Sequence, residues 1–183
     1  MRVAGIDLSL TRTGVGLIDF DGHDCTAQTM VVESSGRRSD SLLSRDRRMY
    51  SIAVEVLTLC EGATLAAIEG PALSRLGGSS WDRSATWWRV VHGLHVDNVQ
   101  VVSVNPSTLK KWATGRGNAD KSDVSVAMAR LWPDVEAASN DGWDGLALAT
   151  MAAQHLDWPV PERANHAESI DRVDWADGKR DVS

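Results

Sequence analysis

Residues 2–33, RVAGIDLSLTRTGVGLIDFDGHDCTAQTMVVE, decide the fold because they hold three apolar runs separated by polar turns. The first run, 2–8, contains Asp7 at its carboxyl end and leads into a turn rich in serine and threonine. The second run, 14–20, is separated from the third, 25–33, by an Asp-Gly dipeptide that is typical of hairpins. Strands in such tight succession pair antiparallel. The stretch therefore predicts a three-stranded antiparallel meander.

The next segment predicts a parallel crossover. Apolar residues between Met49 and Cys60 recur on one helical face, and Gly62 is a suitable helix cap. The run 63–69, ATLAAIE, is then continuously apolar up to a final carboxylate, which indicates a short buried strand. A strand, a helix and a strand in this order favour a right-handed parallel connection.

The remaining sequence completes an α/β pattern. We predict helices at 81–96, from 106 onward, at 121–131 and at 140–156, and a fifth strand at 99–104. The order predicts a mixed five-stranded sheet, with three meander strands and two parallel strands, flanked by helices. We assign residues 1–156 to this domain. Residues 157–183 have two prolines, many charges and no sustained period, so we predict a flexible polar tail there.

Charge and cysteine content narrow the function classes. The net charge of −6 argues against a polyanion partner, but residues 133–183 alone carry −7, so residues 1–132 sum to +1. Basic residues concentrate at 34–49 and 74–121. The two cysteines lack C-x-x-C spacing, which argues against a zinc knuckle and favours a reducing cytoplasm. No run of 18 apolar residues is present, which argues against a membrane span.

Four carboxylates occupy the ends of predicted elements. Asp7 and Glu69 end two apolar strands that can be neighbours, while Asp141 and Asp144 lie one turn apart at the start of the last helix. Converging carboxylates repel one another unless cations neutralise them, and oxygen ligands favour Mg²⁺ or Mn²⁺. Two such ions can activate water and stabilise the leaving oxygen in phosphodiester hydrolysis. The pattern indicates metal-dependent phosphodiester chemistry.

Four motifs in order resemble the RuvC-type Holliday junction resolvases of the ribonuclease-H-like superfamily. They are GIDLSLTRTGVGLI (5–18), AAIEG (66–70), NPSTLKKWATGRGNADKSDV (105–124) and DGWDGLALA (141–149), and the likeness spans about residues 2–156. The third motif is the most specific. The resemblance implies a ribonuclease-H-like fold, a crossover junction endodeoxyribonuclease acting in DNA recombination and repair, and a homodimer on four-way DNA junctions.

The resemblance also implies roles for individual residues. Asp7, Glu69, Asp141 and Asp144 match the metal-binding acids, which would hold two Mg²⁺ ions per site, with Mn²⁺ able to substitute. Lys110 and Lys121 match basic residues that contact DNA near the scissile phosphate, and Lys121 is also a candidate catalytic residue. The further candidates for DNA binding, all in the basic stretch 74–121, are Lys111, Arg116 and Arg75.

The chain departs from the family pattern after Glu69. Family members place an aromatic residue a few positions on, whereas this sequence continues Gly-Pro-Ala-Leu. Trp81, Trp87 or Trp88 are candidate substitutes from the next segment. Trp81 and Trp88 share a helical face, so we predict burial of Trp88 in the core or in a dimer seam and leave Trp87 open. Phage-type members accept varied branched DNA, and this chain fits that group too, in a bacterial cell or a phage-infected host.

Two alternative functions remain open from the sequence. The turn after Asp7, with Gly14, also resembles the first phosphate motif of actin-like and sugar-kinase ATPases, which normally need two such domains. The other alternative is a non-catalytic relative that binds branched nucleic acid. The presence of all four acids favours the nuclease.

Overall fold

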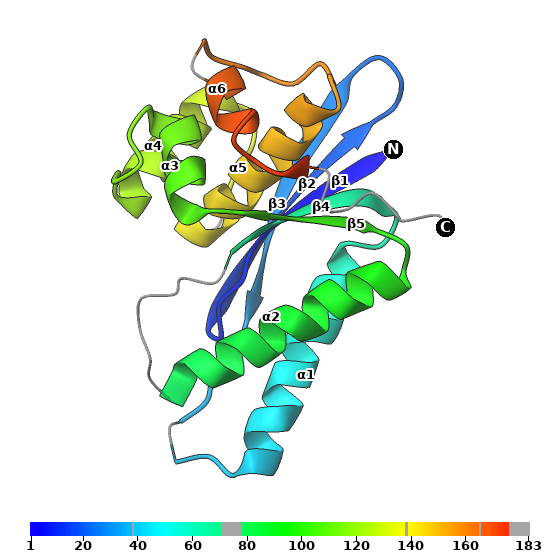
Figure 1. The fold of residues 1–183 in the computed structure, drawn as a ribbon, viewed down its shortest axis with the longest axis vertical. Helices are drawn as coiled ribbons and strands as arrows, with labels where there is room; N and C mark the ends of the chain where they lie inside the picture. The colour runs from blue at the N-terminus through cyan, green and yellow to red at the C-terminus, as the bar shows by residue number, and fades with distance from the viewer. Residues whose placement is uncertain (38, 71–77, 138, 165, 176–183) are drawn as a thin grey trace.

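The computed structural model describes residues 1–37, 39–70, 78–137, 139–164 and 166–175. Five strands of the described chain form one sheet in the order β3-β2-β1-β4-β5 (Figure 1). The strands are β1 (Arg2–Asp7), β2 (Arg12–Phe20), β3 (Cys25–Glu33), β4 (Ala63–Glu69) and β5 (Gln100–Val104). The helices are α1 (Leu42–Leu59), α2 (Gly78–Val96), α3 (Pro106–Thr114), α4 (Lys121–Leu131), α5 (Asn140–His155) and α6 (His166–Ile170).

The sheet confirms the predicted mixed topology. β1 pairs antiparallel with β2, and β2 pairs antiparallel with β3, so the first three strands form the meander. β4 pairs parallel with both β1 and β5. Because the parallel register joins Ile6 to Ile68, Asp7 and Glu69 follow at the same level at one edge of the sheet.

Helices cover both faces of the sheet. α1 and α2 lie on one face, whereas α5, with α3, α4 and α6 beside it, lies on the other (Figure 1). Side chains of a strand alternate between faces, so Ala4 and Ile6 enter the α1–α2 core while Val3 enters the α5 core. The same alternation directs Asp7 toward α5. Within the described residues, none of the helices has the length and apolar character needed to cross a membrane.

α5 approaches the sheet closely because β2 has glycines beneath it. A Cβ on Gly14 would lie 1.7 Å from the carbonyl oxygen of Asp141, and a Cβ on Gly16 would lie 2.3 Å from the Cα of Leu146. Neither distance leaves room for a side chain, since ordinary contacts between carbon atoms are about 3.5–4.0 Å. The glycines therefore allow the first turns of α5, with their two aspartates, to lie directly on β1 and β2.

The segment after residue 156 packs on the core, contrary to the predicted flexible tail at 157–183. Trp158, Val160, Val173 and Trp175 are buried in the α5 core, and the short helix α6 packs against α3. Arg163 donates to the carbonyl oxygens of two residues that belong to α3 and α4. Composition misses this packing because isolated apolar anchors among charged residues leave no helical or strand period. For the described residues, the predicted boundary at 156 is wrong.

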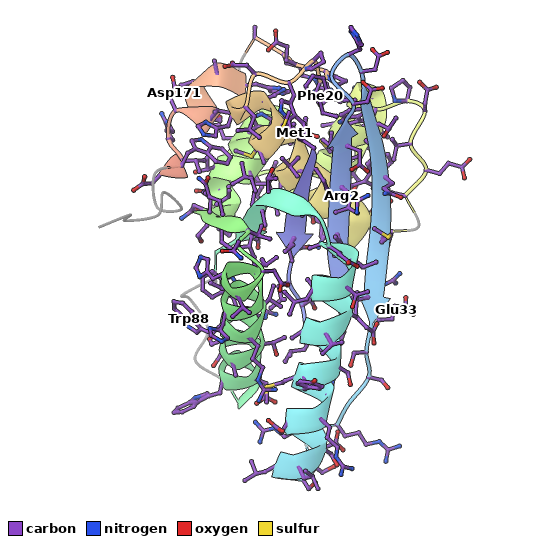
Figure 2. The ribbon with its side chains drawn as sticks, turned by 90° about the vertical axis from the view of Figure 1, so that its right-hand side faces the viewer. Met1, Arg2, Phe20, Glu33, Trp88 and Asp171 are labelled. Atoms are coloured by element: carbon purple, nitrogen blue, oxygen red, sulfur yellow. The ribbon has the colours of Figure 1, made fainter. Side chains whose placement is uncertain are left out.

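Trp88 is not buried in the core of the chain, and its burial in a dimer seam stays a prediction. Trp88 is 65% exposed and projects from α2 away from the body of the molecule (Figure 2). The face of α2 that packs on the sheet contains Val90, Val91 and Leu94, which share a helical stripe with Trp87. Trp88 falls outside this stripe. Trp81 is likewise exposed.

Candidate active site

The first two acids stand at the ends of adjacent parallel strands. Asp7 is the last residue of β1 and is only 8% exposed. Glu69 is the last residue of β4 and is half-buried. Because the carboxyl ends of parallel strands meet at the same edge, the two carboxylates share one end of the sheet. The Nε1 of Trp87 donates to the carbonyl oxygen of Glu69 at 3.0 Å, which fixes α2 to the end of β4.

The second pair of acids comes from the first turns of α5. Asp141 lies in the first turn and is partly exposed, whereas Asp144 is 6% exposed. The positive end of the helix dipole favours carboxylates at this place. Since α5 rests on Gly14, which is the cross-strand neighbour of Asp7, these acids lie beside the end of β1.

Lys121 joins three of the four acids. Its Nζ donates to Asp7 Oδ2 at 2.9 Å and to Asp141 Oδ1 at 2.7 Å, and it lies 2.9 Å from Asp144 Oδ2. Lys121 is the first residue of α4, whose start is fixed by a capping box between Asp120 and the third helical residue. The glycine-containing loop before α4 therefore places the Lys121 ammonium between Asp7, Asp141 and Asp144.

Burial and charge shift the protonation of this cluster. Burial, followed by the negative charges of Asp7 and Asp144, raises the pKa of Glu69 to about 7. Burial also raises the pKa of Asp144 to about 6, although Lys121 opposes the shift. Burial alone would lower the pKa of Lys121, but the charge of Asp7 and the hydrogen bond to Asp141 outweigh it, so that pKa is raised. The four carboxyl groups outnumber the one lysine among them, so binding of further cations would stabilise their ionised forms.

The donor set suits a hard divalent cation. Four carboxylates from β1, β4 and α5 surround one end of the sheet, and carboxylate oxygens are the ligands that Mg²⁺ and Mn²⁺ prefer. Among the described residues, no group of three or more histidine, cysteine, aspartate or glutamate side chains is already arranged to hold a metal ion. A cation does stand there, namely the Lys121 ammonium, which contacts three of the acids. The residues present therefore fit a metal centre in charge and chemistry.

Arg12 is a site residue that sequence reasoning missed. Its Nε lies 3.7 Å from Asp141 Oδ2, and its Nη2 lies 3.2 Å from Glu33 Oε1. The turn before it is closed by Thr13, whose Oγ1 donates to the Ser9 carbonyl oxygen at 2.8 Å. A cation directly after the turn that follows the first acid was the signal available in the sequence.

The predicted DNA-binding residues fall in different places. Lys110 is half-buried, and its positive charge acts on Glu69, so it lies on the side of the acids. Lys111 pairs instead with Glu168 of α6 at 2.8 Å. Arg116 pairs with Asp123 at 3.1 Å on the exposed loop before α4. Arg75 lies outside the described residues.

Comparison with known proteins places the chain in a family. No family model matches it. The crossover junction endodeoxyribonuclease RuvC of Polynucleobacter asymbioticus is 30% identical over 159 residues, which cover 87% of this chain and 92% of that protein. This chain belongs to the RuvC family. The RuvC protein of Afipia carboxidovorans is 27% identical over 158 residues, 85% of this chain and 90% of that one.

A solved RuvC structure confirms the fold that the resemblance implied. The Thermus thermophilus RuvC in complex with Holliday junction substrate superposes with a TM-score of 0.69 at 23% identity, covering 88% of this chain and 99% of that one. The RuvC relatives named here are bacterial, and membership of a phage-type group stays a prediction. The roles of individual residues at the site rest on the geometry described above.

Proposed function

We propose that this chain hydrolyses phosphodiester bonds of four-way DNA junctions, using divalent metal ions held by Asp7, Glu69, Asp141 and Asp144. The observation that carries the proposal is the convergence of three of these acids, Asp7, Asp141 and Asp144, on Lys121 from elements at both ends of the chain. Family membership supports the reaction class, since the relatives are crossover junction endodeoxyribonucleases. It favours the nuclease over the ATPase and the non-catalytic alternatives.

The metal component of the proposal follows from the donor chemistry. Two Mg²⁺ ions, with Mn²⁺ as a substitute, would activate a water and stabilise the leaving oxygen when bound. The protein supplies the rest. Burial restricts the carboxylates of Asp7 and Asp144, and the Trp87 side chain holds the backbone of Glu69 by donating to its carbonyl oxygen. Lys110 and Lys121 provide positive charge where DNA phosphate would approach.

A homodimer is the second component of the proposal. A four-way junction presents two equivalent strands, which suit two sites related by a two-fold axis. Tyr50 of α1 is 64% exposed, and Trp81 and Trp88 of α2 are 78% and 65% exposed. Large apolar side chains exposed on one helical layer are typical of a surface that is covered by a partner. We assign the dimer seam to this layer, with α2 at its centre.

Junction cleavage tests the nuclease proposal. We expect wild-type protein with Mg²⁺ to cut a four-way junction and to leave a linear duplex of the same sequence intact. Asp7→Asn should reduce cleavage by orders of magnitude while the protein stays folded, because it removes a ligand charge and little volume. Asp134→Asn, a change on the exposed loop between α4 and α5, is the matched control. Three-way junctions and flaps in the same assay define the substrate range.

Two results would contradict the nuclease proposal. A folded wild-type protein that leaves junctions uncut with Mg²⁺ and Mn²⁺, yet melts at a higher temperature with ATP, would favour the ATPase alternative. Junction binding without cleavage under the same conditions would favour the non-catalytic relative.

Light scattering tests the dimer. We expect twice the monomer mass at micromolar concentration, and Trp88→Ala should weaken the dimer by about 30-fold if Trp88 contributes roughly 2 kcal/mol at the seam. Val126→Ala is the control, because Val126 is also exposed but lies on α4 in the opposite helical layer. A monomer both alone and on a junction contradicts this component of the proposal.

A further inference from the structure

The Lys121 ammonium contacts the same carboxylate oxygens that a metal ion would need as ligands. Its Nζ donates to Asp7 Oδ2 at 2.9 Å and to Asp141 Oδ1 at 2.7 Å, and it forms an ion pair with Asp144 Oδ2 at 2.9 Å. An ammonium has three donors and no acceptor, so two hydrogen bonds and one ion pair to carboxylates direct most of its bonding capacity to the acids. Lys121 therefore neutralises the acids from within the cluster.

We propose that Lys121 is an internal counter-cation that a divalent metal ion must displace in order to bind. This inference rests on the proposed function, because it concerns the same four acids. A divalent ion that takes Asp7 Oδ2, Asp141 Oδ1 and Asp144 Oδ2 as ligands needs the space that the Lys121 Nζ occupies between them, and repulsion between the two cations adds to this competition. Binding of the metal then breaks three contacts of Lys121, and the apparent metal affinity is weakened by their combined free energy.

The surroundings of Lys121 allow it to leave without disturbing the fold. Its side chain is 45% exposed, whereas those of Asp7 and Asp144 are 12% and 9% exposed. The lysine stem has four rotatable carbon–carbon bonds, so the ammonium can move outward while the backbone stays in place. The capping box of Asp120 and Asp123 holds the start of α4 through other atoms.

Arg12 provides an internal comparison. It also brings a positive charge to Asp141, but its Nε is 3.7 Å away and the guanidinium is shared with Glu33. Arg12 contacts one acid from the rim, whereas Lys121 contacts three from within. Loss of Arg12 removes one positive charge near the site but leaves Lys121 in contact with the carboxylate oxygens.

Calorimetric titration of the full chain with MgCl₂, without DNA, tests the inference. Because Lys121→Gln removes three partly exposed ion pairs that compete with the metal, we expect it to bind Mg²⁺ about tenfold more tightly than the wild type. Lys121→Arg, which keeps the charge, should stay near the wild-type affinity, and Arg12→Gln should tighten binding by less than about threefold. In metal-free buffer, Lys121→Gln should melt below the wild type, because three acids lose their counter-ion, and saturating Mg²⁺ should remove most of the difference.

The wild-type protein supports a second measurement that does not depend on a variant being stable. The chain has four lysines, and the side-chain ¹⁵N signal of Lys121 can be assigned by its loss in Lys121→Arg. We expect this signal to be protected from solvent exchange without metal and to lose protection as Mg²⁺ is added. A signal that stays protected at saturating Mg²⁺ would overturn the inference.

The outcomes separate this inference from the proposed function. Mg²⁺ binding by the wild type, with an equal or weaker affinity in Lys121→Gln, overturns the displacement but leaves a metal-dependent nuclease. Equal gains in Lys121→Gln and Arg12→Gln also overturn it, because they would show a general charge effect. Absence of divalent binding in every variant overturns both the inference and the metal component of the proposed function.

Discussion

Gly14→Ala is expected to disrupt the candidate active site without touching any of its acids. A Cβ at this position would lie 1.7 Å from the carbonyl oxygen of Asp141 and 2.3 Å from its carbonyl carbon. Since heavy atoms in ordinary contact are about 3.5 Å apart, the first turn of α5 must shift by roughly 1–2 Å. A misplacement of about 1 Å can lower a rate 100-fold, so we expect a loss of at least that size in junction cleavage. Overpacking should also destabilise the fold by about 1–3 kcal/mol.

Single-turnover cleavage of a four-way junction, with a urea melt of the same sample, measures both effects. Gly142→Ala is the matched control, because it follows Asp141 directly but its Cβ would meet only side chains, Thr29 at 3.3 Å and Ala137 at 3.6 Å. Alanine is also the better helix former, by up to about 1 kcal/mol, so this variant should keep its stability and cleave within about threefold of the wild type. A folded Gly14→Ala protein that cleaves at the wild-type rate would refute the role of close helix packing in placing the acids.

Two further predictions concern the segment after α5. Truncation after Asp157 removes the buried Trp158 and Trp175, each worth about 1.5–3 kcal/mol, so it should lower the urea midpoint sharply or prevent folding. Burial lowers the pKa of His166 to about 4, so between about pH 6.5 and pH 4 the unfolded chain binds a proton that the folded one does not. Stability should therefore be full above about pH 6.5 and fall by roughly 2–3 kcal/mol as the pH drops through this window, and wild type compared with His166→Gln in urea at pH 7 and pH 5 isolates the effect.

Local patterns were enough to predict the sheet and the position of two acids. The apolar runs ending at Asp7 and Glu69, and the crossover between them, determine which strands are neighbours and where each strand ends. The amphipathic period after Asp141 determines that its helix packs on the sheet. These inferences depend only on spacing along the chain, which the sequence contains in full.

Contacts between distant segments were not predictable in the same way. Lys121 lies 114 residues from Asp7 along the chain, and nothing local to either residue specifies that the two bond directly. Trp88 is a large apolar residue, but the side of α2 that packs on the sheet is formed by the neighbouring stripe with Val90 and Leu94. The segment around Trp158 packs through isolated side chains, and a single anchor has no period to detect.

The separation of the acids along the chain has a consequence during protein synthesis. Asp7 belongs to the central strand β1, yet Asp144 is added 137 residues later. At ribosomal speeds of about 5–20 residues per second, Asp144 is added roughly 7–27 s after Asp7. During that interval the nascent chain has the sheet-forming meander but only half of the carboxylates. Under the proposed assignment of the site, a growing or prematurely terminated chain lacks Asp141 and Asp144, and the four acids come together only once α5 has docked on the glycines of β2.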